Sequence, residues 1–193
     1  MSDAALVAVL AGGRSRRMGR PKATLPFAGG PLIARPLAAA EAAGLEAVVV
    51  AKPDSDLPAL EVEVWWEPAE PAHPLAGVVT ALERAGGRAV LALACDMPFV
   101  APGLLARLAE LRGTAAPLVA GRLEPFPGRY EATALPILRA ALEREAPVRA
   151  ALADLFPLEL GEDELRAFGD PARMVTGVNT PDELRRAERE LAG

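Results

Sequence analysis

Short apolar runs alternate with stretches of helical periodicity along most of the chain, and turn-forming residues separate them. We expect buried strands at residues 4–11, 46–51 and 88–95, because runs of this length and composition are typical of strands covered on both faces. Residues 62–66 alternate apolar and polar positions, which indicates a strand at the edge of a sheet. Further strand candidates are residues 116–120, 130–135 and 174–178.

Proline at a first helical turn and glycine after a last one mark the predicted helices. On these signals, and on apolar periodicity, we expect helices at residues 31–43, 76–85, 102–111, 136–145 and 147–155, and one that begins at residue 181. Residues 53–58 are expected to form a loop that holds one helical turn, and residues 67–75 are too rich in proline for a helix. Residues 156–173 fit no single pattern.

The order of these elements predicts the fold class. A β-α-β order implies a parallel sheet with right-handed crossovers. We therefore expect an α/β protein with one Rossmann-like domain, residues 1–193, in which helices cover both faces of a mostly parallel central sheet. The sequence contains no internal repeat and no stretch with the composition of a domain linker.

Composition excludes several classes of protein. A net charge of −5 disfavours general nucleic-acid binding, and 51% hydrophobic residues argue for a packed core. The one cysteine, Cys95, cannot form a disulfide within the chain, which fits a reducing cytoplasm. We find neither a cleavable signal nor an apolar stretch of membrane-spanning length, so we expect a cytoplasmic protein that does not enter a membrane.

The first strand leads into a cationic glycine turn. Gly12 and Gly13 leave the backbone open to a ligand, and five cations follow within ten residues: Arg14, Arg16, Arg17, Arg20 and Lys22. Exposed N–H groups and cations after a parallel strand are what a polyphosphate needs. The glycine spacing matches neither the Walker P-loop nor the dinucleotide-binding fingerprint.

Two positions carry residue types that are rare in this chain, which makes them stronger candidates for a function. Lys22 is one of two lysines against nineteen arginines, and Asn179 is the chain's one side-chain amide. A compact ammonium can reach a phosphate where a planar guanidinium does not fit.

Asp96 directly follows the most apolar strand, where its carboxylate can hold Mg²⁺ at the sheet's carboxyl edge. Asn179 has two interpretations that the residues leave open. It is either a second metal ligand or a turn residue ahead of a capping box formed by Thr180 and Glu183.

Several motifs together resemble a known family. Residues 10–22 read L-A-G-G-R-S-R-R-M-G-R-P-K, which resembles the signature of nucleotidyltransferases that make sugar nucleotides and dinucleotide cofactors. Within that group the chain most resembles the molybdenum cofactor guanylyltransferases. Residues 94–98 resemble the metal-binding Asp motif, residues 74–77 the segment that closes over the nucleotide, and residues 178–182 the C-terminal Asn-Thr-Pro motif. Less specifically, residues 124–136 resemble the acceptor-side segment.

The resemblance implies a nucleotide-diphospho-sugar transferase-like fold and transfer of GMP from GTP to the terminal phosphate of molybdopterin or the molybdenum cofactor. It also implies Mg²⁺ as cofactor, held by Asp96 and Asn179. The catalytic residues it implies are Arg17, Lys22 and Asp96. The nucleotide-binding residues it implies are Leu10, Ala11, Gly12, Gly13, Lys22, Glu67 and Asp96. As partners it implies GTP, the pterin acceptor, molybdoenzymes and cofactor-carrier proteins; we expect a monomer that binds no nucleic acid.

Departures from the family pattern leave the base open. His73, Glu67 and Ala51 stand where relatives usually have Gly, Asp and Asn, whereas Gly12 favours guanine by leaving room for a purine. A cytidylyl- or uridylyltransferase on the same scaffold remains an alternative, and so does a catalytically silent nucleotide-binding regulator. We expect His73 at the surface and Cys95 to be an inert core residue.

Overall fold

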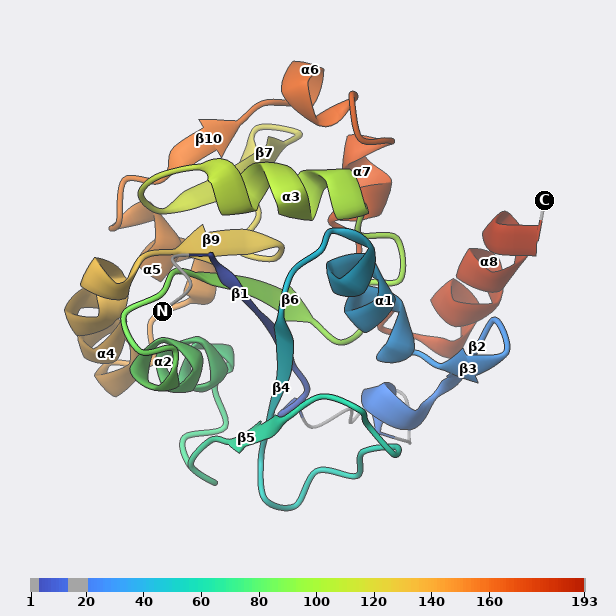
Figure 1. Ribbon diagram of the computed structural model, residues 1–193, viewed down its shortest axis with the longest axis horizontal. Helices are drawn as coiled ribbons and strands as arrows, with labels where there is room; N and C mark the ends of the chain where they lie inside the picture. The colour runs from blue at the N-terminus through green and yellow to red at the C-terminus, as the bar shows by residue number, and fades with distance from the viewer. Residues whose placement is uncertain (1–3, 14–20, 193) are drawn as a thin grey trace.

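The computed structural model describes residues 4–13 and 21–192. Its main-sheet strands are β1 (Leu6–Leu10), β4 (Ala47–Ala51), β5 (Val64–Trp66), β6 (Val90–Ala94), β7 (Ala115–Val119), β8 (Arg122–Leu123), β9 (Gly128–Tyr130) and β10 (Leu158–Leu160). Within the described ranges they form an eight-stranded sheet in the order β10-β7-β9-β6-β1-β4-β5, with β8 beside β7 (Figure 1). The predicted edge position of residues 62–66 is confirmed by β5, and the predicted buried strand at 88–95 contains β6, which lies in the middle of the sheet.

The sheet is mostly parallel, as predicted. β1 runs parallel to both of its neighbours, β4 and β6, and β5 continues the parallel set. β9 reverses direction and pairs antiparallel with β6 and β7. The parallel strands end at one edge of the sheet, which is where an open α/β sheet binds its ligands.

Helices cover both faces of the sheet (Figure 1). They are α1 (Ala34–Ala42), α2 (Pro74–Arg84), α3 (Pro102–Glu110), α4 (Leu135–Glu143), α5 (Val148–Ala153), α6 (Glu162–Leu165), α7 (Pro171–Met174) and α8 (Pro181–Ala192). Val7 and Val9 of β1 belong to the core shared with α1 and α3, whereas Leu6 and Ala8 belong to the core shared with α2, α4 and α5. This alternation follows from the two-residue period of a strand and explains why the whole run is apolar.

Three predicted elements are wrong in detail. The helix expected from residue 31 begins at Ala34, because β3 (Gly30–Pro31) pairs with β2 (Pro26–Phe27) in a hairpin. The strand expected over 130–135 stops at Tyr130, and a 3₁₀ turn (Ala132–Ala134) follows it. The strand expected over 174–178 is absent from this described segment, where α7 ends and an irregular loop begins.

Smaller differences concern loops. Residues 53–58, all of them described, contain a turn but no helix, and α2 begins two residues before the predicted start at 76. The ambiguous stretch 156–173 forms β10, α6 and the start of α7. β10, α6 and α7 have three or four residues each, and so few residues show no clear apolar period in the sequence.

The C-terminal helix α8 lies beside the β2–β3 hairpin (Figure 1). A small apolar cluster joins them: Leu25, Phe27, Leu32, Val178 and Ala187. The predicted capping box is present, because Thr180 Oγ1 accepts from Glu183 N at 3.2 Å and Glu183 Oε2 accepts from Thr180 N at 3.1 Å. This arrangement fixes the turn that carries Asn179.

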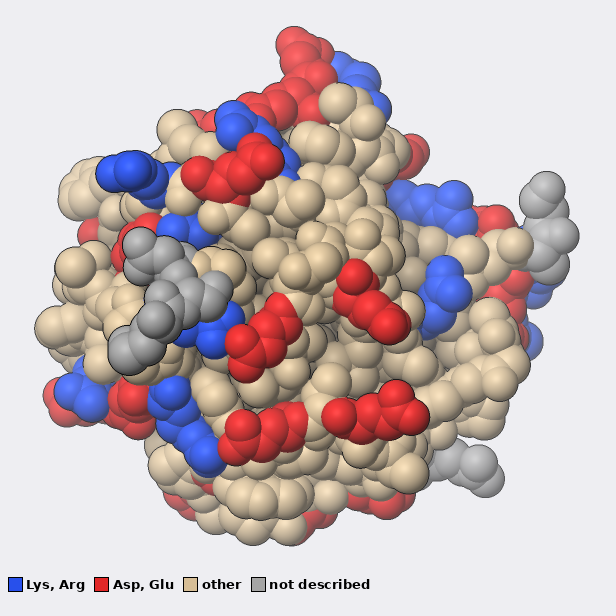
Figure 2. All heavy atoms as spheres, viewed as in Figure 1, with Lys and Arg blue, Asp and Glu red and all other residues tan. Residues whose placement is uncertain are grey.

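On the face seen in Figure 2, acidic and basic side chains are interspersed. In the described ranges, none of the helices has the length and the hydrophobicity that a membrane crossing requires.

Candidate active site

A cavity of about 930 Å³ opens at the carboxyl ends of β1, β4, β5 and β6. It is lined by all of the predicted nucleotide-binding residues: Leu10, Ala11, Gly12, Gly13, Lys22, Glu67 and Asp96. The structure thus brings together residues from the segments that follow β1, β5 and β6, as the rule for open α/β sheets requires. Arg17, predicted to be catalytic, lies outside the described residues together with the other arginines of its loop.

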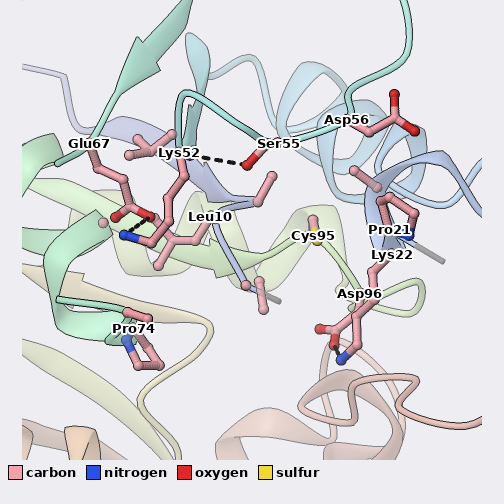
Figure 3. Close-up of a pocket in the computed structure, with 18 of the residues that line it drawn as sticks. Leu10, Pro21, Lys22, Lys52, Ser55, Asp56, Glu67, Pro74, Cys95 and Asp96 are labelled. Atoms are coloured by element: carbon pink, nitrogen blue, oxygen red, sulfur yellow. Dashed lines mark hydrogen bonds and ion pairs between the residues drawn. The ribbon is translucent and has the colours of Figure 1, made fainter. Parts of the chain in front are cut away.

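Lys22, Asp96 and Asn179 meet at one end of this cavity. The Lys22 ammonium contacts Asp96 Oδ2 and donates to Asn179 Oδ1 at 2.7 Å. Figure 3 shows the Lys22 and Asp96 side chains side by side. Residues from three distant parts of the sequence therefore form one charged group, which we call the phosphate end.

The backbone around Asp96 explains this convergence. Asp96 follows β6 and is 8% exposed, and its carbonyl accepts a hydrogen bond from Val178 N at 2.9 Å. A Cβ added at Gly177 would lie 2.9 Å from Asp96 Oδ1, so only glycine lets the two segments approach this closely. The Val178 bond and the glycine together bring Asn179 beside Lys22, which lines the cavity.

Asn179 forms the bonds of a turn residue, and its side-chain oxygen contacts a cationic group. Its amide Nδ2 donates to Gly177 O at 3.0 Å, and its backbone N donates to Glu183 Oε2 at 2.6 Å, which are turn-forming bonds. Its Oδ1 faces the Lys22 ammonium. A turn residue can therefore also offer an oxygen to a cation.

The oxygen atoms at the phosphate end fit a divalent cation. Asp96 and Asn179 already direct one oxygen each at a single ammonium, which stands in for a cation held by oxygen ligands. Among the described residues no cluster of three His, Cys, Asp or Glu side chains could hold a metal. The site thus fits Mg²⁺, which keeps several waters and shares phosphate oxygens, better than a metal held by protein ligands alone.

A second ionic group lies in the same cavity and was not predicted in full. Lys52 Nζ lies 3.6 Å from Glu67 Oε1 and donates to the carbonyl oxygens of Pro68, at 2.7 Å, and Pro71, at 3.2 Å. Lys52 and Glu67 point toward each other in Figure 3. We call this pair the base end.

Both side chains of the base end are buried, and this burial affects the pKa of the Glu67 carboxyl. Lys52 and Glu67 are 3% and 5% exposed. Burial raises the pKa of the Glu67 carboxyl above its usual range, and the adjacent Lys52 ammonium acts in the opposite direction. The sequence reasoning missed Lys52, although it is the chain's other lysine and directly follows a buried strand.

Gly12 makes room for this ion pair. A Cβ added there would collide with Glu67 Oε1 and would lie 3.3 Å from Lys52 Cγ. The Glu67 carboxylate therefore fills the space that the sequence interpretation assigned to a purine. At Gly77 on α2 an added Cβ would lie 3.2 Å from Glu67 Oε2, whereas at Gly13 it would meet none of the described residues within 4 Å.

Other residues singled out in the sequence have structural roles. His73, expected at the surface, is half-buried and caps α2, because its Nδ1 accepts from Leu75 N at 3.2 Å. Burial raises the pKa of the Cys95 thiol to about 12, which agrees with an inert core residue. Trp65 is buried, and Arg84 lies 4.9 Å above its ring.

The acceptor-side segment contributes little to the cavity walls in the described part of the chain. Glu124 pairs with Arg149 at 3.1 Å, and the buried Tyr130 donates to Pro125 O at 2.9 Å. Phe126 is the residue of this segment that lines the cavity.

Known proteins resemble the chain over nearly all of its length. Residues 7–159 match the MobA-like NTP transferase domain. A probable molybdenum cofactor guanylyltransferase of Chloroflexus aggregans is 30% identical over 95% of this chain and 93% of its own length. The molybdenum cofactor guanylyltransferase of Rhodobacter capsulatus is 34% identical over 95% of this chain and 94% of its own length.

A crystal structure gives the same result for the fold. Molybdopterin-guanine dinucleotide biosynthesis protein A from Archaeoglobus fulgidus superimposes with a TM-score of 0.80 at 28% sequence identity. The match covers 97% of this chain and 98% of that one. The resemblance deduced from short motifs therefore extends to the whole sheet and to the helices around it.

Proposed function

Because the chain belongs to the MobA-like NTP transferase family, we propose that it transfers GMP from GTP to the terminal phosphate of molybdopterin or the molybdenum cofactor. The products are the guanine dinucleotide form of the cofactor and pyrophosphate. The observation that carries this proposal is one cavity that has the Lys22 ammonium at one end and the buried Glu67 carboxylate at the other.

The reaction is an in-line displacement at the α-phosphorus of GTP. An oxygen of the acceptor phosphate forms a new P–O bond, and the bond from the α-phosphorus to the bridging oxygen of pyrophosphate breaks. The acceptor phosphate is ionised at neutral pH, so no dedicated general base is required. Catalysis then depends on positioning and on stabilising charge.

Lys22 is the described residue best placed to stabilise that charge. Its ammonium lies at the phosphate end, where it can move from Asp96 and Asn179 onto the α-phosphate or the leaving pyrophosphate. Arg17 is assigned the same task from the sequence alone.

Mg²⁺ would be held by Asp96, with Asn179 as a second oxygen ligand. When bound, it supplies Lewis-acid stabilisation of phosphate charge. Asp96 fixes the place of that charge, because its backbone is tied to Val178 and its side chain packs against Gly177. Asn179 is fixed in turn by the cap of α8.

The base end supports guanine. The Watson–Crick edge of guanine carries two adjacent N–H donor groups, N1–H and the 2-amino group, and a carboxylate has two oxygens that can accept both. Cytosine, adenine and uracil lack that pair of donors. A site built to accept hydrogen bonds rejects analogues that lack the donors, because its acceptors then remain unpaired.

Pyrophosphate release with molybdopterin as acceptor tests the proposal. We expect turnover with GTP, and much slower turnover with CTP and UTP. Preference for CTP or UTP would retain the scaffold and mechanism but overturn the base assignment. Binding of GTP without any pyrophosphate release would favour the silent regulator instead.

A further inference from the structure

Lys52 is an unusual residue for a nucleotide-binding cavity. Its ammonium is buried, and it faces away from the phosphate end. Two of its bonds go to the main chain of the loop after β5, at Pro68 and Pro71, and its ion pair goes to Glu67. Removing a lysine ammonium from water costs free energy, which the partners of the buried ammonium have to offset. A buried lysine in a binding cavity therefore suggests a role for the contacts that it makes.

We infer that Lys52 is a positioning residue for base recognition, which holds Glu67 as an ionised carboxylate so that both of its oxygens can accept N–H groups of guanine. This inference rests on the proposed function and extends it. Lys52 touches neither the phosphates nor the reacting atoms in this arrangement, and it acts through Glu67.

The charge on Glu67 decides what the base end recognises. A neutral carboxylic acid presents an O–H donor to the cavity, and that donor would oppose the N–H donors of guanine. Burial of Glu67 favours the neutral form, and Lys52 is the group that opposes it. Lys52 therefore acts on specificity as well as on packing.

The surroundings of Glu67 leave this task to Lys52. Gly12 after β1 and Gly77 on α2, which lie against the carboxylate, carry no charge. The other titratable side chains of described residues that line the cavity are Lys22, Asp54, Asp56, His73, Cys95 and Asp96. Within the described ranges, Lys52 is the one cation that forms an ion pair with Glu67.

The carboxylate also retains unused acceptor capacity. The Lys52 ammonium approaches Oε1 from one side at 3.6 Å. Among the described residues, no backbone N–H or hydroxyl donates to either oxygen of Glu67, and both the residue and its partner line the cavity. A ligand with two adjacent donors would satisfy both oxygens.

Comparison of GTP with ITP tests the inference, because ITP lacks only the 2-amino group. We expect the wild-type protein to bind GTP about tenfold more tightly than ITP, as the loss of a hydrogen bond to a charged acceptor predicts. Lys52→Met removes the charge and keeps most of the aliphatic volume. It should weaken GTP binding and bring the GTP-to-ITP affinity ratio close to one, as Glu67→Gln should.

The pH profile separates positioning from a merely structural role. In Lys52→Met the pKa of Glu67 should rise further, so GTP binding should be weakest at low pH and should recover as the pH rises toward neutrality and the Glu67 carboxyl ionises. Glu67→Gln and the double variant should lack this recovery. Isothermal titration calorimetry with GTP and ITP gives both readouts.

The double variant keeps the inference testable if Lys52→Met does not fold. Lys52→Met/Glu67→Gln leaves no unpaired buried charge, and its GTP-to-ITP ratio should equal that of Glu67→Gln alone. The inference is overturned if Lys52→Met weakens GTP and ITP equally at every pH. It is also overturned if Lys52→Met changes the ratio in the Glu67→Gln background.

Failure of the proposed function would look different. A wild-type protein without any preference for GTP over ITP would contradict the guanine assignment, whatever the lysine variants do. A wild-type protein that prefers GTP, with a Lys52→Met variant that keeps this preference at every pH, would contradict only the role of Lys52.

Discussion

Each end of the cavity holds a lysine paired with a carboxylate, but the two pairs differ in exposure and in how firmly they are held. At the phosphate end Lys22 is about one-fifth exposed and its partners come from loops, so its ammonium can change partners. At the base end the lysine and the glutamate are both nearly inaccessible, and two main-chain carbonyls hold the ammonium in place. The first pair can exchange its ionic partners, whereas the second pair is held in place by the surrounding main chain.

From this difference we predict that the two ends have separate roles in catalysis and in the choice of nucleotide. A partly exposed ion pair is weakly stabilising and is easily exchanged for another ionic contact. A buried pair depends strongly on geometry, because loss of one partner leaves an unpaired charge. We therefore expect substitutions at the phosphate end to change turnover, and substitutions at the base end to change the choice of nucleotide.

The largest effect should come from Asp96→Ala at the phosphate end. It removes the carboxylate proposed to hold Mg²⁺, so turnover should fall about a hundredfold to a thousandfold. Pyrophosphate release measures this effect. Asp54→Ala is the matched control, because Asp54 also lines the cavity but is exposed. Retention of Mg²⁺-dependent turnover in Asp96→Ala would refute the role of the carboxylate.

Gly12→Ala tests the base end by adding a Cβ atom next to the Glu67 carboxylate. The added Cβ collides with the Glu67 carboxylate and should displace it, so GTP affinity should fall about tenfold. Gly161→Ala is the control, because Gly161 lies outside the cavity lining and an added Cβ there meets none of the described residues within 4 Å. Titration with GTP compares the two, and an equal loss in both variants would mean that the Glu67 contact is irrelevant.

Lys22→Ala tests whether the phosphate end and the base end bind different parts of the nucleotide. It should weaken GTP binding about tenfold through the lost phosphate contact, and it should leave guanosine binding unchanged. Glu67→Gln should weaken both ligands. Equal effects of Lys22→Ala on GTP and guanosine would show that the lysine supports the whole cavity rather than the phosphates.

The smallest effects should distinguish Asn179 from its neighbour in the turn. Thr180→Ala removes a cap of α8 and should lower the free energy of unfolding by about 1 kcal/mol. Asn179→Ala should instead raise the Mg²⁺ concentration required for half-maximal turnover. Chemical denaturation and a Mg²⁺ titration measure the two effects, and a loss of stability alone in Asn179→Ala would leave it a turn residue.

The phosphate end could be predicted from the sequence because its residues break local rules. Asp96 follows an apolar strand, Lys22 is a lysine among arginines, and Asn179 is a unique amide. Parallel strands bring Asp96 and the loop after β1 to one edge whatever the details of packing. Asn179 is placed there instead by the irregular segment after α7, through the bond from Val178 to Asp96. The main strands and most of the helices were predicted for a similar reason, since their apolar patterns are long.

The base end could be predicted only in part. The ion pair between Lys52 and Glu67 depends on how β4 and β5 align, and on the space left at Gly12 and Gly77. Neither is a property of a local pattern. The false strand at 174–178 has a related cause, because its apolar residues are buried by packing rather than by pairing in the sheet. Met174 lies in the core shared with α1 and α3, and Val178 lies in the cluster at the β2–β3 hairpin.

One measurement tests the central claim most directly, namely that a single cavity binds the triphosphate at one end and selects guanine at the other. It is a thermal shift with GTP, CTP, UTP and ATP, each with and without Mg²⁺. A ligand at about a hundred times its dissociation constant adds roughly 2.7 kcal/mol of stability. We predict a shift with GTP that Mg²⁺ increases, and little shift with the other nucleotides. A larger shift with CTP, or equal shifts with all four nucleotides, would contradict the account.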